Sequence, residues 1–330
     1  MSEEWRTLAD RVRNWGRWGE HDQLGCLNHI TADALAGAAT LATQGKSFSL
    51  AIPLDGDSPM GPHGLRRAPV HLMSLDGGDE SLGNRLQGFG GYAAREAEAL
   101  EQTGPFRAND DWILMPLQSS TQWDALCHGY YEGQMYNGVP ASASTSLGVT
   151  RNAIDTVAAA GGVAGRGVLL DVARHRGVAH LEPQSVVTAQ ELDAVATAQG
   201  VTIHTGDIVL VRTGWWPRYA ELGVGNGVEW QMGSPGLDWR AAEWLHDHDI
   251  AAVACDNVAV EPTMPADNGL ILTLHMLTLR DMGLMLGELW DLEALATDCA
   301  ADGIYEFFLT APPLRVTGGT GSPINPIAFK

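Results

Sequence analysis

The 330-residue sequence predicts a mixed α/β fold, because segments with helix signals alternate with short apolar runs. The runs GVLLDV at 167–172, DIVLVRTGW at 207–215 and IAAVACDN at 250–257 follow turns and contain or end in polar residues. Short apolar runs bounded in this way are typical of buried strands. No break in composition divides the chain, so we expect a single domain over residues 1–330.

Two helices have clear start and stop signals. Thr31 is a candidate cap for a helix through ADALAGAATLATQ, which would stop at Gly45. Thr188 and Glu191 form a capping-box pattern at the start of AQELDAVATAQ, which would end at Gly200. By contrast, the segment 76–110 is glycine-rich and weakly periodic, so we expect a long excursion or arm there.

Charge and cysteine content exclude several classes of protein. The chain has 20 basic and 40 acidic side chains, and the acidic ones are spread along its length. This balance argues against nucleic acid and anionic membranes as partners. Four cysteines lie far apart without C-x-x-C spacing, so neither a disulfide framework nor a thiolate zinc site is expected. Without an apolar run long enough to span a membrane, we expect a cytoplasmic protein.

The stretch QSSTQWDALCHGYY at 118–131 concentrates polar side chains that suit a metal site. Asp124 is its best single ligand, because it is an anionic oxygen donor, whereas Gln118 and Gln122 offer neutral carbonyl oxygens. The apolar segment DWILMPL before the stretch favours a strand. If extended geometry continued, Gln118 and His128 would share a side but lie roughly 30 Å apart, so a common site requires a bend.

The same stretch resembles a motif of the cyclase family of metal-dependent hydrolases, which includes bacterial kynurenine formamidases and isatin hydrolases. That motif reads H-x-G-T-H-x-D-x-P-x-H, and Thr121, Asp124 and His128 match it in register. The resemblance extends from about Trp15 to the C-terminus, through GVLLDVARHRGV, GDIVLVRTGW and GGTGSPINPIAF. It implies a swivelling β/β/α fold, in which a barrel-like or layered sheet holds the metal and helices pack outside.

The resemblance also implies a ligand set. Its metal ligands correspond to Asp124 together with His275 and Glu288, which lie in HMLTLRDMGLMLGELWDL. This chain departs from the motif at Gln118 and Gln122, which replace two metal-binding histidines. We therefore expect one divalent ion, Mn²⁺ or Zn²⁺ with Fe²⁺ as the third option, and Gln122 as a weak fourth ligand.

The expected reaction is hydrolysis of an amide, imide or lactam C–N bond in a small cyclic or aromatic substrate by metal-activated water. His128 would take a proton from that water and return it to the leaving nitrogen. Two alternatives stay open: a metal-dependent lyase or cyclase, and a binding protein that has lost its metal. The resemblance further implies a homodimer or homotetramer.

Several other roles are assigned from residue type. Cys127 could act as a nucleophile, but its parity is opposite to that of Asp124 and His128, so a core position is favoured. The Asp124–His128 spacing also fits a pair on a helix surface. Aromatic side chains and one histidine are expected to line the substrate pocket: Trp123, Tyr130, Tyr131, Trp215, Trp216 and His71.

Overall fold

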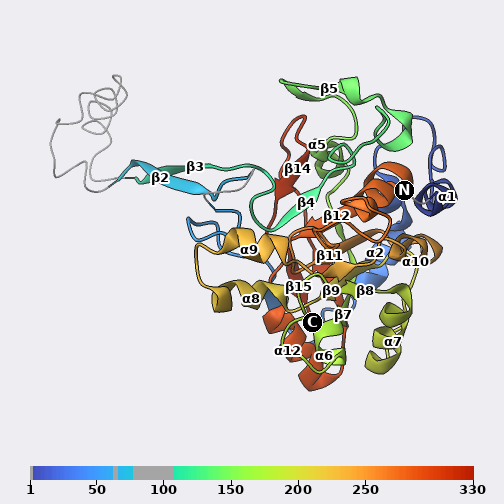
Figure 1. Cartoon of the computed structure of the whole chain (residues 1–330). Coiled ribbons are helices and arrows are strands. Elements are labelled where there is room, and N and C mark those ends of the chain that lie inside the picture. The colour runs from blue at the N-terminus through green and yellow to red at the C-terminus, as the bar shows by residue number, and fades with distance from the viewer. Residues whose placement is uncertain (1–2, 62–65, 77–107) are drawn as a thin grey trace, which may run out of the picture.

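One mixed sheet runs through the middle of the molecule in the computed structural model, which describes residues 3–61, 66–76 and 108–330 (Figure 1). Within these residues the sheet has nine strands. In spatial order they are β1 (Ser47–Ser49), β15 (Ile327–Phe329), β13 (Glu306–Thr310), β7 (Ala164–Asp171), β9 (Ile208–Arg212), β11 (Ala252–Cys255), β12 (Met285–Glu288), β4 (Gln122–Asp124) and β14 (Gly321–Pro323).

The centre of the sheet is parallel and its two flanks are antiparallel. β7, β9, β11 and β12 run in the same direction, whereas β4 pairs antiparallel with both β12 and β14. Parallel strands need crossover connections, and the chain supplies them with helices between successive strands. The predicted strands at 167–172, 207–215 and 250–257 are confirmed as β7, β9 and β11, with shifted ends.

Helices surround the sheet, with α8 and α9 on one side and α7 and α10 on the other in the view of Figure 1. The α-helices are α1 (Glu4–Arg11), α2 (Ala32–Ala39), α5 (Ile154–Ala159), α6 (Val172–His175), α7 (Ala189–Gln199), α8 (Trp215–Leu222), α9 (Gly227–Met232), α10 (Ala241–Asp247), α11 (Thr273–His275) and α12 (Glu293–Asp302). Short 3₁₀-helices are η1 (Gly25–His29), η2 (Tyr136–Gly138) and η3 (Ala141–Ala143), and α11 continues directly into the π-helix η4 (Met276–Met282).

Both predicted helix caps are present. The Thr31 hydroxyl accepts a hydrogen bond from the main-chain N–H of Ala34 at 3.1 Å, although α2 ends at Ala39, before the predicted stop at Gly45. The Thr188 hydroxyl accepts from the N–H of Glu191, and α7 ends at Gly200 in the left-handed conformation. These ends agree with local capping chemistry.

Alternate residues of each central strand enter two different apolar cores. On β12, Leu286 packs in a core with Leu274 and Leu277 of the α11–η4 helix, whereas Met285 packs with Trp123 and Trp290 on the opposite face. We call these the helix-side core and the tryptophan-side core. Because side chains alternate along a strand, a residue's parity decides which face of the sheet it serves.

The segment DWILMPL forms a strand outside the main sheet. β3 (Asp110–Leu114) pairs antiparallel with β2 (Val70–Leu75) in a hairpin that projects away from the body (Figure 1). The predicted arm at 76–110 falls almost entirely on 77–107, which lie outside the described residues. Two further small ribbons pair β5 (Ser144–Thr145) with β6 (Gly148–Val149) and β8 (Val186–Val187) with β10 (Gly236–Leu237).

In the described part of the chain, no helix has the length and apolar character that crossing a membrane requires.

Candidate metal centre

Two neighbouring strands bring two carboxylates to the helix-side face of the sheet. In the β4–β12 register, Asp124 lies opposite Leu286, and Gln122 lies opposite Glu288. Residues two apart on a strand share a face, so Asp124 and Glu288 are diagonal neighbours on one side. Both are buried, and the short β4 reaches its place only because β12 and β14 flank it.

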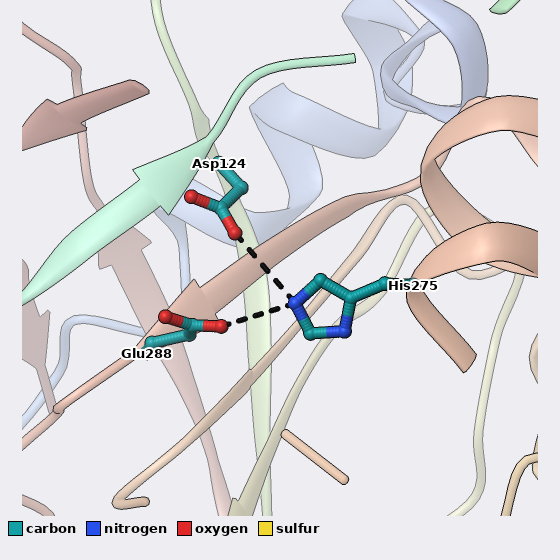
Figure 2. Close-up of side chains that lie close together, drawn as sticks. All are labelled: Asp124, His275 and Glu288. Atoms are coloured by element: carbon teal, nitrogen blue, oxygen red, sulfur yellow. Dashed lines mark hydrogen bonds and ion pairs between the residues drawn. The ribbon is translucent and has the colours of Figure 1, made fainter. Parts of the chain in front are cut away.

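His275 approaches these carboxylates from the helix that covers this face. It is the last residue of α11, and its Nε2 atom lies 3.2 Å from Oε1 of Glu288 and 3.8 Å from Oδ2 of Asp124. One ligand atom from each of the three residues lies within 4.8 Å of the other two (Figure 2). The structure thus brings together three residues that are far apart in the sequence.

The carboxylate of Asp124 lacks the donors that a buried charge needs. Its side chain is fully buried, and neither oxygen has a hydrogen-bond partner among the described residues. Burial raises the pKa of Asp124 to about 6, with a smaller contribution from the nearby charge of Glu288. An isolated buried carboxylate is strongly destabilising unless a cation compensates it. Together with His275 and Glu288, this carboxylate fits a divalent metal ion.

Glu261 holds His275 in place, and sequence reasoning missed it. Its Oε1 atom lies 2.8 Å from both the main-chain nitrogen and the ring Nδ1 of His275. Burial lowers the pKa of His275, but the hydrogen bonds to Glu261 and Glu288 outweigh this effect and raise the pKa to about 10. With Nδ1 held by Glu261, Nε2 points toward Asp124 and Glu288, as metal-binding histidines require.

The two predicted glutamine ligands have different contacts beside the cluster. Gln122 donates from Nε2 to Oε2 of Glu288 at 2.6 Å, while its Oε1 is buried without a partner among the described residues. Gln118 donates from Nε2 to the Thr320 hydroxyl at 2.9 Å. Its amide is accommodated beside Gly321, where a Cβ atom would lie 2.7 Å from that Nε2. Gln122 therefore buttresses Glu288, and Gln118 belongs to the β14 side.

His128 reaches the cluster through the bend that the sequence required. The chain leaves β4 at Asp124 and turns, with the main-chain N–H of His128 donating to the carbonyl of Ala125 at 2.8 Å. The ring Nε2 then lies 3.7 Å from Oδ2 of Asp124, and the side chain is 25% exposed. The predicted need for a bend is confirmed, whereas the helix-surface alternative was wrong, because the pair spans a strand end and a turn.

A second missed residue, Arg66, lies beside the cluster. Its Nη1 donates to the main-chain oxygen of Gln118 at 3.0 Å and lies 3.6 Å from Oε2 of Glu288. Arg66 follows a glycine- and proline-rich segment that is distant in sequence from every predicted ligand. No local pattern could have signalled it.

The model of a protein family described as Putative cyclase matches residues 48–262, which is more than half of the chain. The chain belongs to this cyclase family. The match confirms the resemblance predicted from 118–131, although it ends before His275 and Glu288.

Several solved structures share the fold of this chain. This cyclase-family chain is similar to a crystal structure of a novel cyclase, with 39% identity and a TM-score of 0.84 over 97% of this chain and 100% of that chain. It also resembles an isatin hydrolase bound to the product analogue thioisatinate, with 18% identity and a TM-score of 0.60 over 90% of this chain and 98% of that one. Isatin hydrolase A from Labrenzia aggregata, bound to benzyl benzoate, is 20% identical, with a TM-score of 0.59 over 90% of this chain and 97% of that one. These similarities confirm the predicted mixed α/β fold of the cyclase family. Among curated protein sequences, none matches the chain.

The structure does not assemble the predicted aromatic wall. Trp123 has the opposite parity to Asp124, is fully buried in the tryptophan-side core and donates from Nε1 to the carbonyl of Ala311 at 2.8 Å. Trp215 packs with Trp230 in a separate cluster at α8 and α9. In this member of the cyclase family, then, alternation along β4 separates Trp123 from the carboxylates.

The other four predicted pocket residues lie in different settings. Tyr131 follows His128 closely in the chain, and its hydroxyl donates to Asp281 at 2.7 Å. Tyr130 is exposed. His71 lies on the projecting hairpin, where Nε2 is 2.6 Å from Asp111, so it pairs within the hairpin. Trp216 stacks near Tyr219 in the α8 and α9 cluster.

Proposed function

We propose that this chain is a metal-dependent hydrolase that cleaves an amide, imide or lactam C–N bond in a small cyclic or aromatic substrate. The observation that carries the proposal is the buried Asp124 carboxylate, whose oxygens have no donor among the described residues and lie beside His275 and Glu288. Such an arrangement is stabilised by a bound cation.

The proposed ligands are Asp124, His275 and Glu288, with Gln122 supporting Glu288. Two carboxylates and one imidazole suit Mn²⁺ or Zn²⁺, with Fe²⁺ as the third option. When bound, such an ion lowers the pKa of water and polarises a carbonyl group.

His128 is the proposed proton carrier of the site. Its Nε2 atom lies 3.7 Å from Asp124, close enough to serve a reacting group in the same space, and its partial exposure allows proton exchange with solvent. The ring would accept a proton from the attacking water and deliver it to the leaving nitrogen.

The substrate class is supported by the shared fold of the cyclase family. Its structural neighbours include isatin hydrolases, and isatin is an aromatic cyclic amide. Tyr130 and Tyr131 immediately follow the turn that carries His128, and we propose that they contact the substrate ring. We also propose that residues 1–330 form one domain and that the chain assembles as a homodimer or homotetramer.

Hydrolysis of isatin in ¹⁸O-labelled water by the Mn²⁺- or Zn²⁺-loaded protein tests the proposal. We expect ring opening with one solvent oxygen in the product carboxylate, lost in Asp124→Asn and strongly reduced in His128→Asn. A panel of N-acyl anilines extends the test to open-chain amides. A protein that binds metal and cleaves none of these C–N bonds would contradict the proposal.

Ring closure is the second candidate, because the matching family is described as a cyclase. Closing a lactam is the reverse of opening it, so the same side chains serve both directions. The two are distinguished by incubating the loaded protein with the ring-opened acid. Net closure, with release of one water, of a ring-opened acid whose equilibrium favours the ring, without hydrolysis of isatin or the N-acyl anilines, would show a cyclase and not a hydrolase.

A further inference from the structure

The two oxygens of Glu288 face different surroundings. Oε1 lies 3.2 Å from Nε2 of His275, on the side shared with Asp124. Oε2 accepts a hydrogen bond from Nε2 of Gln122 at 2.6 Å and lies 3.6 Å from Nη1 of Arg66. We call Oε1 the inner oxygen and Oε2 the outer oxygen.

Arg66 is anchored across this outer side. The same Nη1 atom donates to the main-chain oxygen of Gln118 at 3.0 Å, so one guanidinium nitrogen spans the segment before β4 and the end of β12. The Arg66 side chain is 28% exposed, whereas that of Glu288 is 2% exposed. Among the ion pairs of the described residues, Arg66 is the one arginine or lysine that reaches a residue of the metal cluster.

A carboxylate with two accessible oxygens can bridge two metal ions, and many hydrolytic sites use this arrangement. Here the outer oxygen already accepts a hydrogen bond from the Gln122 amide and lies 3.6 Å from the fixed positive charge of Arg66. A second cation at this oxygen would have to displace the Gln122 amide and would lie next to a guanidinium of the same sign. Arginine keeps its charge at every working pH, so this repulsion is permanent.

We propose that Arg66 supplies the second positive charge of the site and thereby limits the centre to one divalent ion. The inference rests on the proposed function, because it assumes that Asp124, His275 and Glu288 bind one ion. Arg66 acts through Glu288 and is a positioning residue. The proposal also implies that histidines at positions 118 and 122 would not by themselves create a second metal site, since Arg66 would still lie against the outer oxygen.

Zinc stoichiometry and affinity test the proposal, using apoprotein titrated by calorimetry and checked by elemental analysis. Wild type and Gln118→His/Gln122→His are each expected to bind one ion per chain. Adding Arg66→Gln to the double variant is expected to give two ions, and adding Arg66→Lys is expected to give one, because lysine retains the charge. Arg67→Gln, at the exposed neighbouring arginine, is the matched control and should leave the stoichiometry unchanged.

A second measurement uses variants that keep Gln118 and Gln122, so the test does not depend on the folding of the double histidine variant. In the wild-type background, Arg66→Gln is expected to tighten binding of the single ion by roughly tenfold, since a repelling charge is removed; changes beside a metal ligand commonly act on this scale. Arg66→Lys should bind as wild type does.

Two results would overturn the inference: two ions in the double histidine variant that retains Arg66, or one ion in the folded triple variant with unchanged affinity in Arg66→Gln. A wild-type protein that binds no ion at all would instead refute the proposed function, so the two failures are distinguishable.

Discussion

Oε1 of Glu261 lies 2.8 Å from both the main-chain nitrogen and the ring Nδ1 of His275. The other oxygen of Glu261 accepts from the main-chain N–H of Leu274, also at 2.8 Å. One buried carboxylate therefore caps the start of the α11 helix and orients the imidazole at its end. Because the cap and the ring share a partner, the position of the metal-facing Nε2 is fixed by the fold of this helix.

Removing this carboxylate should weaken metal binding. We expect Glu261→Ala to lower Zn²⁺ affinity by about 10–100-fold, the usual range for a residue that orients a metal-binding histidine. The Zn²⁺ affinity of Glu261→Gln should lie between those of wild type and Glu261→Ala, because the amide keeps one acceptor oxygen. Calorimetric titration of apoprotein measures both, and Glu182→Gln at an exposed position serves as the control. Wild-type affinity in Glu261→Ala would show that the contact is only structural.

Two buried aspartates should respond in opposite ways to the same substitution. Asp124 and Asp256 are both fully buried, and burial raises the pKa of each to about 6. Asp124 has no hydrogen-bond donor among the described residues. Asp256, in contrast, accepts from the main-chain N–H groups of Thr213 and Gly214 at 2.8 and 2.7 Å.

In metal-free protein we expect Asp124→Asn to raise the free energy of unfolding by on the order of 1 kcal/mol, because it removes a buried carboxylate whose oxygens accept no hydrogen bond among the described residues. Asp256→Asn should lower it by about 1–3 kcal/mol, because an amide group cannot accept all of those bonds. Urea denaturation in the presence of a chelator measures both. A destabilised Asp124→Asn would mean that unseen donors already satisfy this carboxylate.

Sequence reasoning found the residues whose chemistry shows in local patterns. The caps at Thr31 and Thr188 and the apolar strands needed only neighbouring residues, and the structure has them. The grouping of Asp124 with His275 and Glu288 came from a family resemblance, since nothing local links a strand, a helix end and another strand. Their role as ligands remains a prediction.

His128 should be required for turnover and not for metal binding. We expect His128→Asn to reduce turnover by about 10²–10⁴-fold while the ion is retained, which is the usual contribution of general acid–base catalysis. Cys127→Ala is the control, because Cys127 lies in the tryptophan-side core and burial raises the pKa of its thiol to about 12. Loss of turnover in the cysteine variant, with metal and fold intact, would contradict this assignment.

The β4–β12 pairing depends on a glycine at the tryptophan-side face. A Cβ atom at Gly287 would lie 2.6 Å from Cβ of Ala254 and 2.8 Å from the ring of Trp123. We expect Gly287→Ala to lower the free energy of unfolding by about 1–3 kcal/mol, as overpacking of a core does. Gly37→Ala, in the open middle of α2, should instead raise it by roughly 0.5–1 kcal/mol. Chemical denaturation measures both variants. Equal changes in the free energy of unfolding for Gly287→Ala and Gly37→Ala would argue against tight packing around Gly287.

The errors of sequence reasoning have physical causes. Trp123 was placed with Asp124 although adjacent strand residues face opposite sides, so parity alone could have excluded it. Glu261 and Arg66 left no local signal, because each acts through a contact with a residue remote in the chain. The sequence showed that a bend was needed but not that it follows Asp124, where the main-chain N–H of His128 donates to the carbonyl of Ala125.

The most direct test of the account is a crystal structure of the metal-loaded protein, with anomalous scattering measured on both sides of the metal absorption edge. We expect one anomalous peak per chain, in direct contact with Asp124, His275 and Glu288, and none at the outer oxygen of Glu288 beside Arg66. Peaks confined to other residues, or two peaks of equal height flanking Glu288, would contradict it.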